Sequence, residues 1–337
     1  MILDGQSLQA IAAAAQALQR GDLLGLPTET VYGLAADAGN DAAVAKIFEA
    51  KGRPANHPLI VHVASAQGVQ RFASHVPDFA QKLIDAFWPG PLTLILPRRP
   101  EVAAVAAGGQ NSVGLRCPSH ATAHAVLQSA EALGVFGVAA PSANLFGRVS
   151  PTTAAHVAGE FGDGLLIIDG GACDVGIEST IVDCTRDAPV LLRPGVLTPK
   201  QLSDACGVTV ITPKMPDADA PRASGTLESH YAPHATVQLM AALELQNAIR
   251  DVAAAGTAAG LVAVWSRSPL QLPAASAGQF KWQHMPESPS DCAHQLFAQL
   301  RDFDAQGVAR IWVEAPPQTP EWDGVRDRLT RAATPTR

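Results

Sequence analysis

Charged residues are scarce in this chain, and positive ones are in the minority. Only 16% of its 337 residues are charged, and 31 acidic against 24 basic side chains give a formal net charge of −7. A broad nucleic acid surface needs clustered cations that neutralise phosphates. Aromatic residues, on which single-stranded bases stack, make up only 5%. We therefore expect weak or no direct binding of nucleic acid, with room only for a local basic pocket.

Cysteine is also rare, and long apolar runs are missing. Five cysteines without a C-x-x-C pair argue against structural zinc and indicate a reducing compartment. His120 and His124 have helical spacing but no third ligand in sight, so no protein-held metal site is predicted. No apolar stretch is long enough to span a bilayer, and the N-terminal residues lack a signal-peptide pattern. We expect a cytoplasmic protein with no membrane segment.

Apolar residues, by contrast, make up 47% of the chain, enough for two domains with a large core. Short apolar runs alternate with helical patterns over residues 1–211, which predicts an α/β domain around one sheet. The first 22 residues read as one amphipathic helix. Strands are predicted at 23–27, 58–64, 92–97, 112–116, 137–142, 165–169 and 179–183. Helices are predicted at 42–51, 76–88, 122–133 and 152–161.

The composition changes after this domain. Residues 212–235 are dense in proline, serine and alanine without any period, which indicates a linker or a functional loop. Strands and helices alternate again over residues 236–337, which predicts a small Rossmann-like module. This module lacks a G-x-G-x-x-G motif, so nothing marks it as a dinucleotide-binding domain.

Polar residues gather where the predicted strands end, which is where α/β sheets collect ligands. Thr28, Glu29 and Thr30 in PTETVYGLAAD follow the first strand and suit a small polar substrate. An ordinary turn, with threonines present for their β propensity, explains this segment equally well. Arg116 ends the strand SVGLR; taken alone, such an arginine is more often structural. Its neighbour Cys117 is expected to be a buried, inert thiol.

A second group of residues suits phosphates. Lys51 and Arg53 leave the end of a predicted helix, with Gly52 as its cap, and the histidines of ANHPLIVH follow. Converging lysine and arginine fit a polyphosphate, an interpretation that we favour over simple complements to the helix dipole. In the loop APSANLFGRVSPT, small polar residues can cradle a nucleotide. Ser150 is also expected to cap the helix 152–161, with Pro151 at its first position, and both roles are compatible.

Taken in order, these segments resemble the YrdC-like family in its long, two-domain form, the L-threonylcarbamoyladenylate synthases. The resemblance covers roughly the first 235 residues, and this many ordered motifs is far more specific than any one of them. Two departures are His57, where the family usually has asparagine, and ASGT at the start of the linker. The matching motifs are PTETVYGL, Lys51-Gly52-Arg53 with PLIVH, WPGPLTLIL, VGLRCP, Ser142-Ala143-Asn144, GIESTIVD, LLRPG and the HYAP end of the linker.

The resemblance implies a twisted mixed α/β sheet with a concave basic face, followed by the small C-terminal domain. It also implies the roles of individual residues. L-Threonine would be held by Thr30, His62, Arg116, Ser179 and the backbone at Ala140. ATP would be lined by Arg53, His57, Ser112, Ser142, Asn144, Ser150 and Arg193, with Lys51 beside it. Tyr231 in the linker would close over the nucleotide as a lid.

The implied reaction joins L-threonine, bicarbonate and ATP into threonylcarbamoyl-AMP and pyrophosphate, for modification of tRNA next to the anticodon. Positioning and cations would carry the catalysis, with Lys51 and Arg53 foremost, and Mg²⁺ would be held largely by the nucleotide. A downstream tRNA threonylcarbamoyl transferase complex is the implied partner. Two alternatives stay open at this point: an RNA-binding module of the same fold without turnover, and carbamoyl transfer of the kind found in hydrogenase-maturation proteins.

Overall fold

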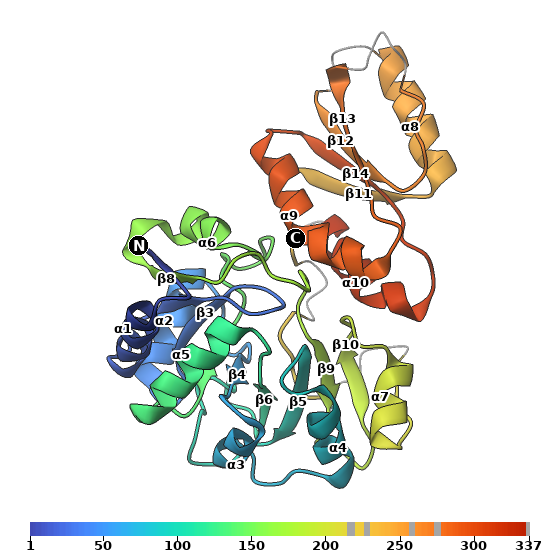
Figure 1. Cartoon of the computed structure of the whole chain (residues 1–337). Helices are drawn as coiled ribbons and strands as arrows, with labels where there is room; N and C mark the ends of the chain where they lie inside the picture. Colours follow the sequence, from blue (N-terminus) through green and yellow to red (C-terminus); the bar gives the residue numbers. More distant parts are fainter. Residues whose placement is uncertain (214–219, 226–229, 256–259, 273–277, 335–337) are drawn as a thin grey trace. The chain divides into compact units, whose positions relative to one another are not determined.

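The computed structural model in Figure 1 describes residues 1–213, 220–225, 230–255, 260–272 and 278–334. The chain forms two compact units, one of residues 1–146 with 150–226 and one of 147–149 with 227–337. Residues 214–219 and 226–229 of the predicted linker lie outside the described residues, so the predicted division at 211 and 235 stays a prediction. Within the part of the chain that the structure describes, no helix has the length and apolar character needed to cross a membrane.

The first unit is built on one mixed sheet of ten strands, as the α/β pattern predicted. The strands lie in the order β1-β8-β2-β3-β7-β4-β6-β5-β9-β10, with both parallel and antiparallel neighbours. Their bounds are β1 (Ile2–Asp4), β2 (Leu24–Leu26), β3 (Gly33–Asp37), β4 (Ile60–His62), β5 (Leu92–Pro97), β6 (Ser112–Arg116), β7 (Val138–Ala139), β8 (Leu166–Asp169), β9 (Thr180–Asp183) and β10 (Val190–Arg193).

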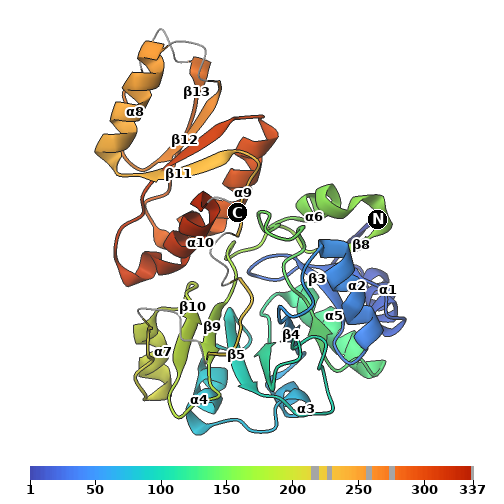
Figure 2. The same cartoon turned by 180° about the vertical axis from the view of Figure 1, so that it is seen from behind.

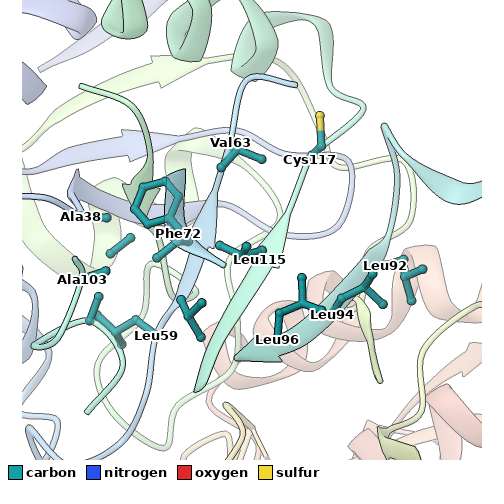
Figure 3. Packing of buried hydrophobic residues seen from close by; sticks show 14 of the residues in the cluster. Ala38, Leu59, Val63, Phe72, Leu92, Leu94, Leu96, Ala103, Leu115 and Cys117 are labelled. Carbon is teal, nitrogen blue, oxygen red and sulfur yellow. The ribbon is translucent and has the colours of Figure 1, made fainter. Parts of the chain in front are cut away.

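Helices cover this sheet through two separate apolar clusters. Helices α1 and α5 lie side by side in Figures 1 and 2 and pack through Ala14, Leu18, Val126 and Leu127. The larger cluster takes in α2, α4 and α7, and Figure 3 shows part of it, including Leu92, Leu94 and Leu96 of β5 and Leu115 of β6. The bounds are α1 (Leu8–Gln19), α2 (Asp41–Lys51), η1 (Ala66–Gly68), α3 (Val69–Phe72), α4 (Asp78–Phe87), α5 (Ala121–Ala132), α6 (Ala154–Phe161), η2 (Gly162–Gly164) and α7 (Pro199–Cys206).

Successive side chains of a strand point to opposite faces of the sheet, so the residues that do not enter the core can contribute to a site on the other face. In β6, Val113 and Leu115 enter the larger cluster, so Gly114 and Arg116 face the other side of the sheet. In β5, the leucines at 92, 94 and 96 enter the same cluster, as Figure 3 shows, and Thr93 faces away from it. A buried polar residue therefore stands on the second face of each of these two neighbouring strands.

The second unit is a small α/β domain with four parallel strands, as predicted for the Rossmann-like module. Its strand order is β11-β14-β12-β13. Leu245 and Ile249 pack against Val264, Phe280 and Trp312 in its core. The bounds are β11 (Thr236–Met240), α8 (Ala242–Ala255), β12 (Val262–Ser266), β13 (Phe280–His284), α9 (Pro289–Ala305), β14 (Arg310–Glu314), η5 (Pro320–Trp322) and α10 (Asp323–Ala333).

Two local predictions were wrong. The first 22 residues form strand β1 and then α1, because Ile2 pairs with Ile167 of β8 far along the chain. Helix α6 begins at Ala154 and not after Ser150, since the Thr153 side chain accepts the capping hydrogen bond from the amide of His156. Ser150 therefore lies before the helix and makes a different contact, described below.

Candidate active site

The loop between β2 and β3 is held in shape by the side chain of Thr28. Its Oγ1 donates to the carbonyl of Val31 at 2.6 Å and accepts from the amide of the same residue at 3.2 Å. Because that hydroxyl proton is already used, the 2.9 Å contact between Thr28 and Thr30 has the Thr30 hydroxyl as its donor. The loop is thereby fixed, with the side chains of Glu29 and Thr30 both buried.

These two side chains meet Arg116, which ends β6. Its guanidinium is 4% exposed and forms a 2.7 Å ion pair with the Glu29 carboxylate. Nη1 donates to Thr30 Oγ1 at 2.7 Å, and Nε donates to the carbonyl of Gly90 at 3.2 Å. Two loops that are distant in the sequence thus orient one buried arginine, as a carboxylate-binding group requires.

The electrostatics of this cluster fix two protonation states. Burial alone would raise the pKa of Glu29, but the charge of Arg116, its direct contact with the carboxylate and nearby backbone amides together outweigh burial and hold this pKa below its usual range. Burial, reinforced by the charge of Arg116, lowers the pKa of His62 to about 3. His62 lies opposite Arg116 in the parallel pair β4 and β6. At neutral pH the cluster therefore contains an ionised glutamate, a charged arginine and a neutral histidine.

A second polar group lies on strand β5 and directly before its neighbour β9. Thr93 Oγ1 and Ser179 Oγ, both in buried residues, are 2.7 Å apart. Arg193, also buried, donates from Nε and Nη2 to the carbonyl of Ser179 at 3.1 and 2.9 Å. Arg193 therefore links the end of β10 to the Ser179 hydroxyl pair.

A short segment of the first unit, residues 222–224, lies on the same face of the sheet. Ala223 packs against the apolar group of Ile60, Ile95 and Ile181. The carbonyl of Ser224 accepts from Arg193 Nη1 at 2.9 Å, and its Oγ accepts from Arg53 Nη2 at 3.4 Å. The two arginines predicted to meet ATP are thus joined through one serine.

Lys51 lies at the end of α2 and holds the loop after β7. Its ammonium donates to the carbonyl of Ser142 at 2.6 Å and to that of Asn144. Burial, followed by the charge of Arg53, lowers the pKa of Lys51 well below its usual value. The side chain is 2% exposed, so main-chain carbonyls, and not water, stabilise its positive charge.

The remaining predicted residues are spread around these groups. His57 packs edge-on against Phe146, with ring centroids 5.6 Å apart. Ser112 opens β6 and lines a small pocket with residues 222–224. Ala140 donates its amide to the carbonyl of Ile60 at 3.0 Å.

Two predicted ATP residues have contacts of a different kind. Ser150 donates its hydroxyl to the buried carboxylate of Glu178, which is the contact it makes in place of a helix cap. Tyr231 belongs to the second unit, where it adopts a φ of 63° and packs against Phe297 and Arg328. Its predicted closure over the nucleotide stays a prediction.

Three residues of this site were not assigned from the sequence. Glu29 was noted in its motif but given no role, and Thr93 was hidden in an apolar strand. A lone polar residue inside LTLILP, on the face opposite to the leucines, is the signal that could have found Thr93. Ser224 offered no comparable signal, because its importance depends on tertiary contacts with Arg53 and Arg193.

The donors on this face suit oxyanions better than a metal cage. Arginine, lysine, serine and threonine predominate, and they donate hydrogen bonds to carboxylates and phosphates. Across the described ranges, no three His, Cys, Asp or Glu side chains are grouped so that they could hold a metal ion. The arrangement can bind a small carboxylate at Arg116 and a phosphate chain near Arg53 and Arg193.

Two family models together match nearly the whole chain. The Sua5/YciO/YrdC model, which carries the description telomere recombination, matches residues 16–195. The model of the threonylcarbamoyl-AMP synthase C-terminal domain matches residues 197–334. The second match separates this chain from the carbamoyl transferases considered above, since it covers the part that the motifs left unassigned.

Individual relatives extend over the same length. The threonylcarbamoyl-AMP synthase of Pyrococcus abyssi is 37% identical over 331 residues, covering 96% of this chain and 94% of the relative. That of Bacillus subtilis is 36% identical over 329 residues, covering 96% and 92%. The solved structure of P. abyssi Sua5 complexed with L-threonine has a TM-score of 0.85 and 35% identity, covering 96% of this chain and 94% of that one. This chain therefore belongs to the Sua5/YciO/YrdC family, in its two-domain form.

Proposed function

We propose that this chain forms threonylcarbamoyl-AMP and pyrophosphate from L-threonine, bicarbonate and ATP. The observation that carries the proposal is the buried Arg116, held by Glu29, Thr30 and the Gly90 carbonyl on the sheet face that also presents Ser179. Relatives of nearly equal length in two distant organisms bear the name threonylcarbamoyl-AMP synthase. Their similarity extends over both units, so the proposal concerns the whole chain.

The Arg116 cluster is the proposed threonine site. Arg116 binds the substrate carboxylate, and Thr30 keeps the guanidinium in place. His62 is buried and neutral, and its Nδ1 has no partner within the described residues, so this nitrogen can meet the substrate without adding charge. Ser179 and the backbone at Ala140 complete the predicted contacts.

The proposed ATP site lies around the two arginines held by Ser224. Arg53 and Arg193 would exchange their contacts with this serine for phosphate oxygens, which accept the same N–H donors more strongly. Lys51 acts beside them by holding the loop that carries Ser142 and Asn144. The further predicted contacts come from His57, Ser112, Ser150 and, as a lid, Tyr231.

Catalysis of this reaction depends more on positioning the substrates than on covalent chemistry by the protein. Bicarbonate gives CO₂ and hydroxide, and the hydroxide takes a proton from the threonine ammonium to form water. The neutral amine then adds to CO₂ and loses one more proton to solvent, which gives a carbamate. A carbamate oxygen then attacks the α-phosphorus of ATP, and pyrophosphate leaves. Arg53 and Arg193 meet the charge that develops on the phosphates. Cys117 is unsuited to act as a nucleophile, because burial raises the pKa of its thiol to about 11.

Mg²⁺ would enter with ATP and neutralise part of the triphosphate charge. Its ligands would be phosphate oxygens and water, in keeping with the cationic and hydroxyl donors on this face. The product would then pass to a tRNA threonylcarbamoyl transferase complex in the cytoplasm. The labile adenylate needs such an acceptor, and the five unpaired cysteines fit a reducing compartment.

The test is pyrophosphate release from ATP and bicarbonate, with L-threonine compared against serine, valine and no amino acid. We expect release that needs threonine and bicarbonate together. Arg53→Ala should lose most of this activity, whereas Arg20→Ala, which removes an exposed ion pair with Asp22, should not. Folded protein with Mg²⁺ present that shows no threonine-dependent release would contradict the proposal, and salt-dependent RNA affinity without turnover would favour an RNA-binding module.

A further inference from the structure

The buried pair of Glu29 and Arg116 matches the charges of a free amino acid. The two side chains are only 5% and 4% exposed. An α-amino acid carries an ammonium and a carboxylate on adjacent atoms, so a complementary site needs opposite charges side by side. Arg116 alone would meet the carboxylate and leave the ammonium buried without a counter-ion, which is strongly unfavourable.

Some buried polar atoms in this cluster lack a hydrogen-bond partner. Oε2 of Glu29 and Nδ1 of His62 are buried and have no hydrogen-bond partner within the described residues, whereas Oε1 of Glu29 and Nη2 of Arg116 contact each other. The 2.7 Å contact between Glu29 and Arg116 uses one carboxylate oxygen and leaves the second oxygen for another donor. Buried polar atoms are normally satisfied, so unsatisfied ones grouped at one point indicate a polar ligand.

We propose that Glu29 binds the α-ammonium group of the amino-acid substrate while Arg116 binds its carboxylate. The inference rests on the proposed function and adds a specificity-determining residue to it. The low pKa of Glu29 keeps its carboxylate ionised at neutral pH. The Thr28 turn keeps the loop that carries it in place. Glu29 thereby selects amino acids over hydroxy acids of the same shape.

The competing explanation is that Glu29 only orients Arg116. The two roles differ in their dependence on the ligand's amine. We would measure binding of L-threonine and of 3-hydroxybutanoate, which lacks the amine, to the wild type and to Glu29→Gln by calorimetry. The glutamine keeps the length of the side chain and removes its charge. Glu29→Asp keeps the charge and serves as the second variant.

We expect Glu29→Gln to weaken threonine binding at least tenfold and to leave 3-hydroxybutanoate within twofold of the wild type. Glu29→Asp should retain the preference for threonine. Equal weakening of both ligands would assign Glu29 to orienting Arg116 and overturn the inference, as would unchanged binding of threonine. ATP binding in each variant reports that the fold is intact. A wild type that binds ATP but no threonine would instead refute the proposed function.

Discussion

Lys51 donates a hydrogen bond from its buried ammonium to the main-chain carbonyl of Ser142, 2.6 Å away. A second bond reaches the carbonyl of Asn144. Both acceptors belong to the loop predicted to line the nucleotide. Lys51 thus supports the loop of the proposed ATP site, and we expect it to act on phosphate binding through this loop.

Lys51→Met should therefore lower both stability and ATP affinity. The substitution removes the lysine donor from the buried carbonyl of Asn144 and leaves the carbonyl of Ser142 with only the Asn144 amide; an unsatisfied buried group costs about 1–3 kcal/mol of unfolding free energy. Denaturant unfolding and nucleotide titration measure the two effects. Lys46→Met is the matched control, because Lys46 on the same helix donates to the carbonyl of Gly21, outside the site. Normal ATP affinity in Lys51→Met would contradict the supporting role.

Much of the fold followed from local patterns. The runs 92–97 and 112–116 form β5 and β6 within the predicted bounds, because alternating leucine and valine residues lie on one buried face. Strand β1 could not be predicted, since its pairing with β8 joins residues 2 and 167. Helix α7 was missed although Thr198, Pro199 and Gln201 form a capping box with proline at the first position.

The candidate site, too, could be predicted from the sequence only in part. Arg116 could be singled out as a charged residue that ends an apolar strand. Its partner Thr30 is 86 residues away, and no local pattern reveals that the two touch. Glu29 and Thr93 stayed unassigned for that reason, since both act through residues contributed by other strands. The chemistry of single residues is visible in the sequence, but their pairing depends on the order of the strands.

Segment 222–224 should compete with ATP for the two arginines. Gln110 fixes this segment, because its side chain accepts from the amide of Arg222 at 2.8 Å and donates to the carbonyl of that residue at 3.2 Å. Gln110→Ala removes both bonds, each worth about 0.5–1.5 kcal/mol. We expect three- to tenfold tighter ATP binding, measured with a fluorescent analogue. Gln67→Ala, at an exposed glutamine, is the control; weaker binding in Gln110→Ala would show that the segment assists the nucleotide.

Thr93 should position Ser179 for the amino-acid substrate. Thr93→Val has nearly the same shape and removes the hydroxyl that lies 2.7 Å from Ser179 Oγ. We expect the KM for threonine to rise several-fold while the KM for ATP stays within twofold, because the lost bond, worth about 1 kcal/mol, lies in the proposed threonine site. Thr93→Ser restores the hydroxyl and should restore the KM. A fall in kcat alone, or equal changes in Thr93→Ser and Thr93→Val, would exclude this role.

The neutral state of His62 should make the protein less stable in mild acid. Its pKa is about 3 in the folded chain and about 6.5 when unfolded, so between these values the unfolded state binds the extra proton. Stability from this residue is therefore complete above pH 6.5 and declines as the pH falls toward 3; we expect a loss of about 2 kcal/mol between pH 8 and pH 5. Denaturant unfolding at both pH values measures it. His62→Gln should remove this part of the pH dependence, whereas His75→Gln, at an exposed histidine, should keep it. An unchanged pH dependence in His62→Gln would mean that other groups set the acid sensitivity.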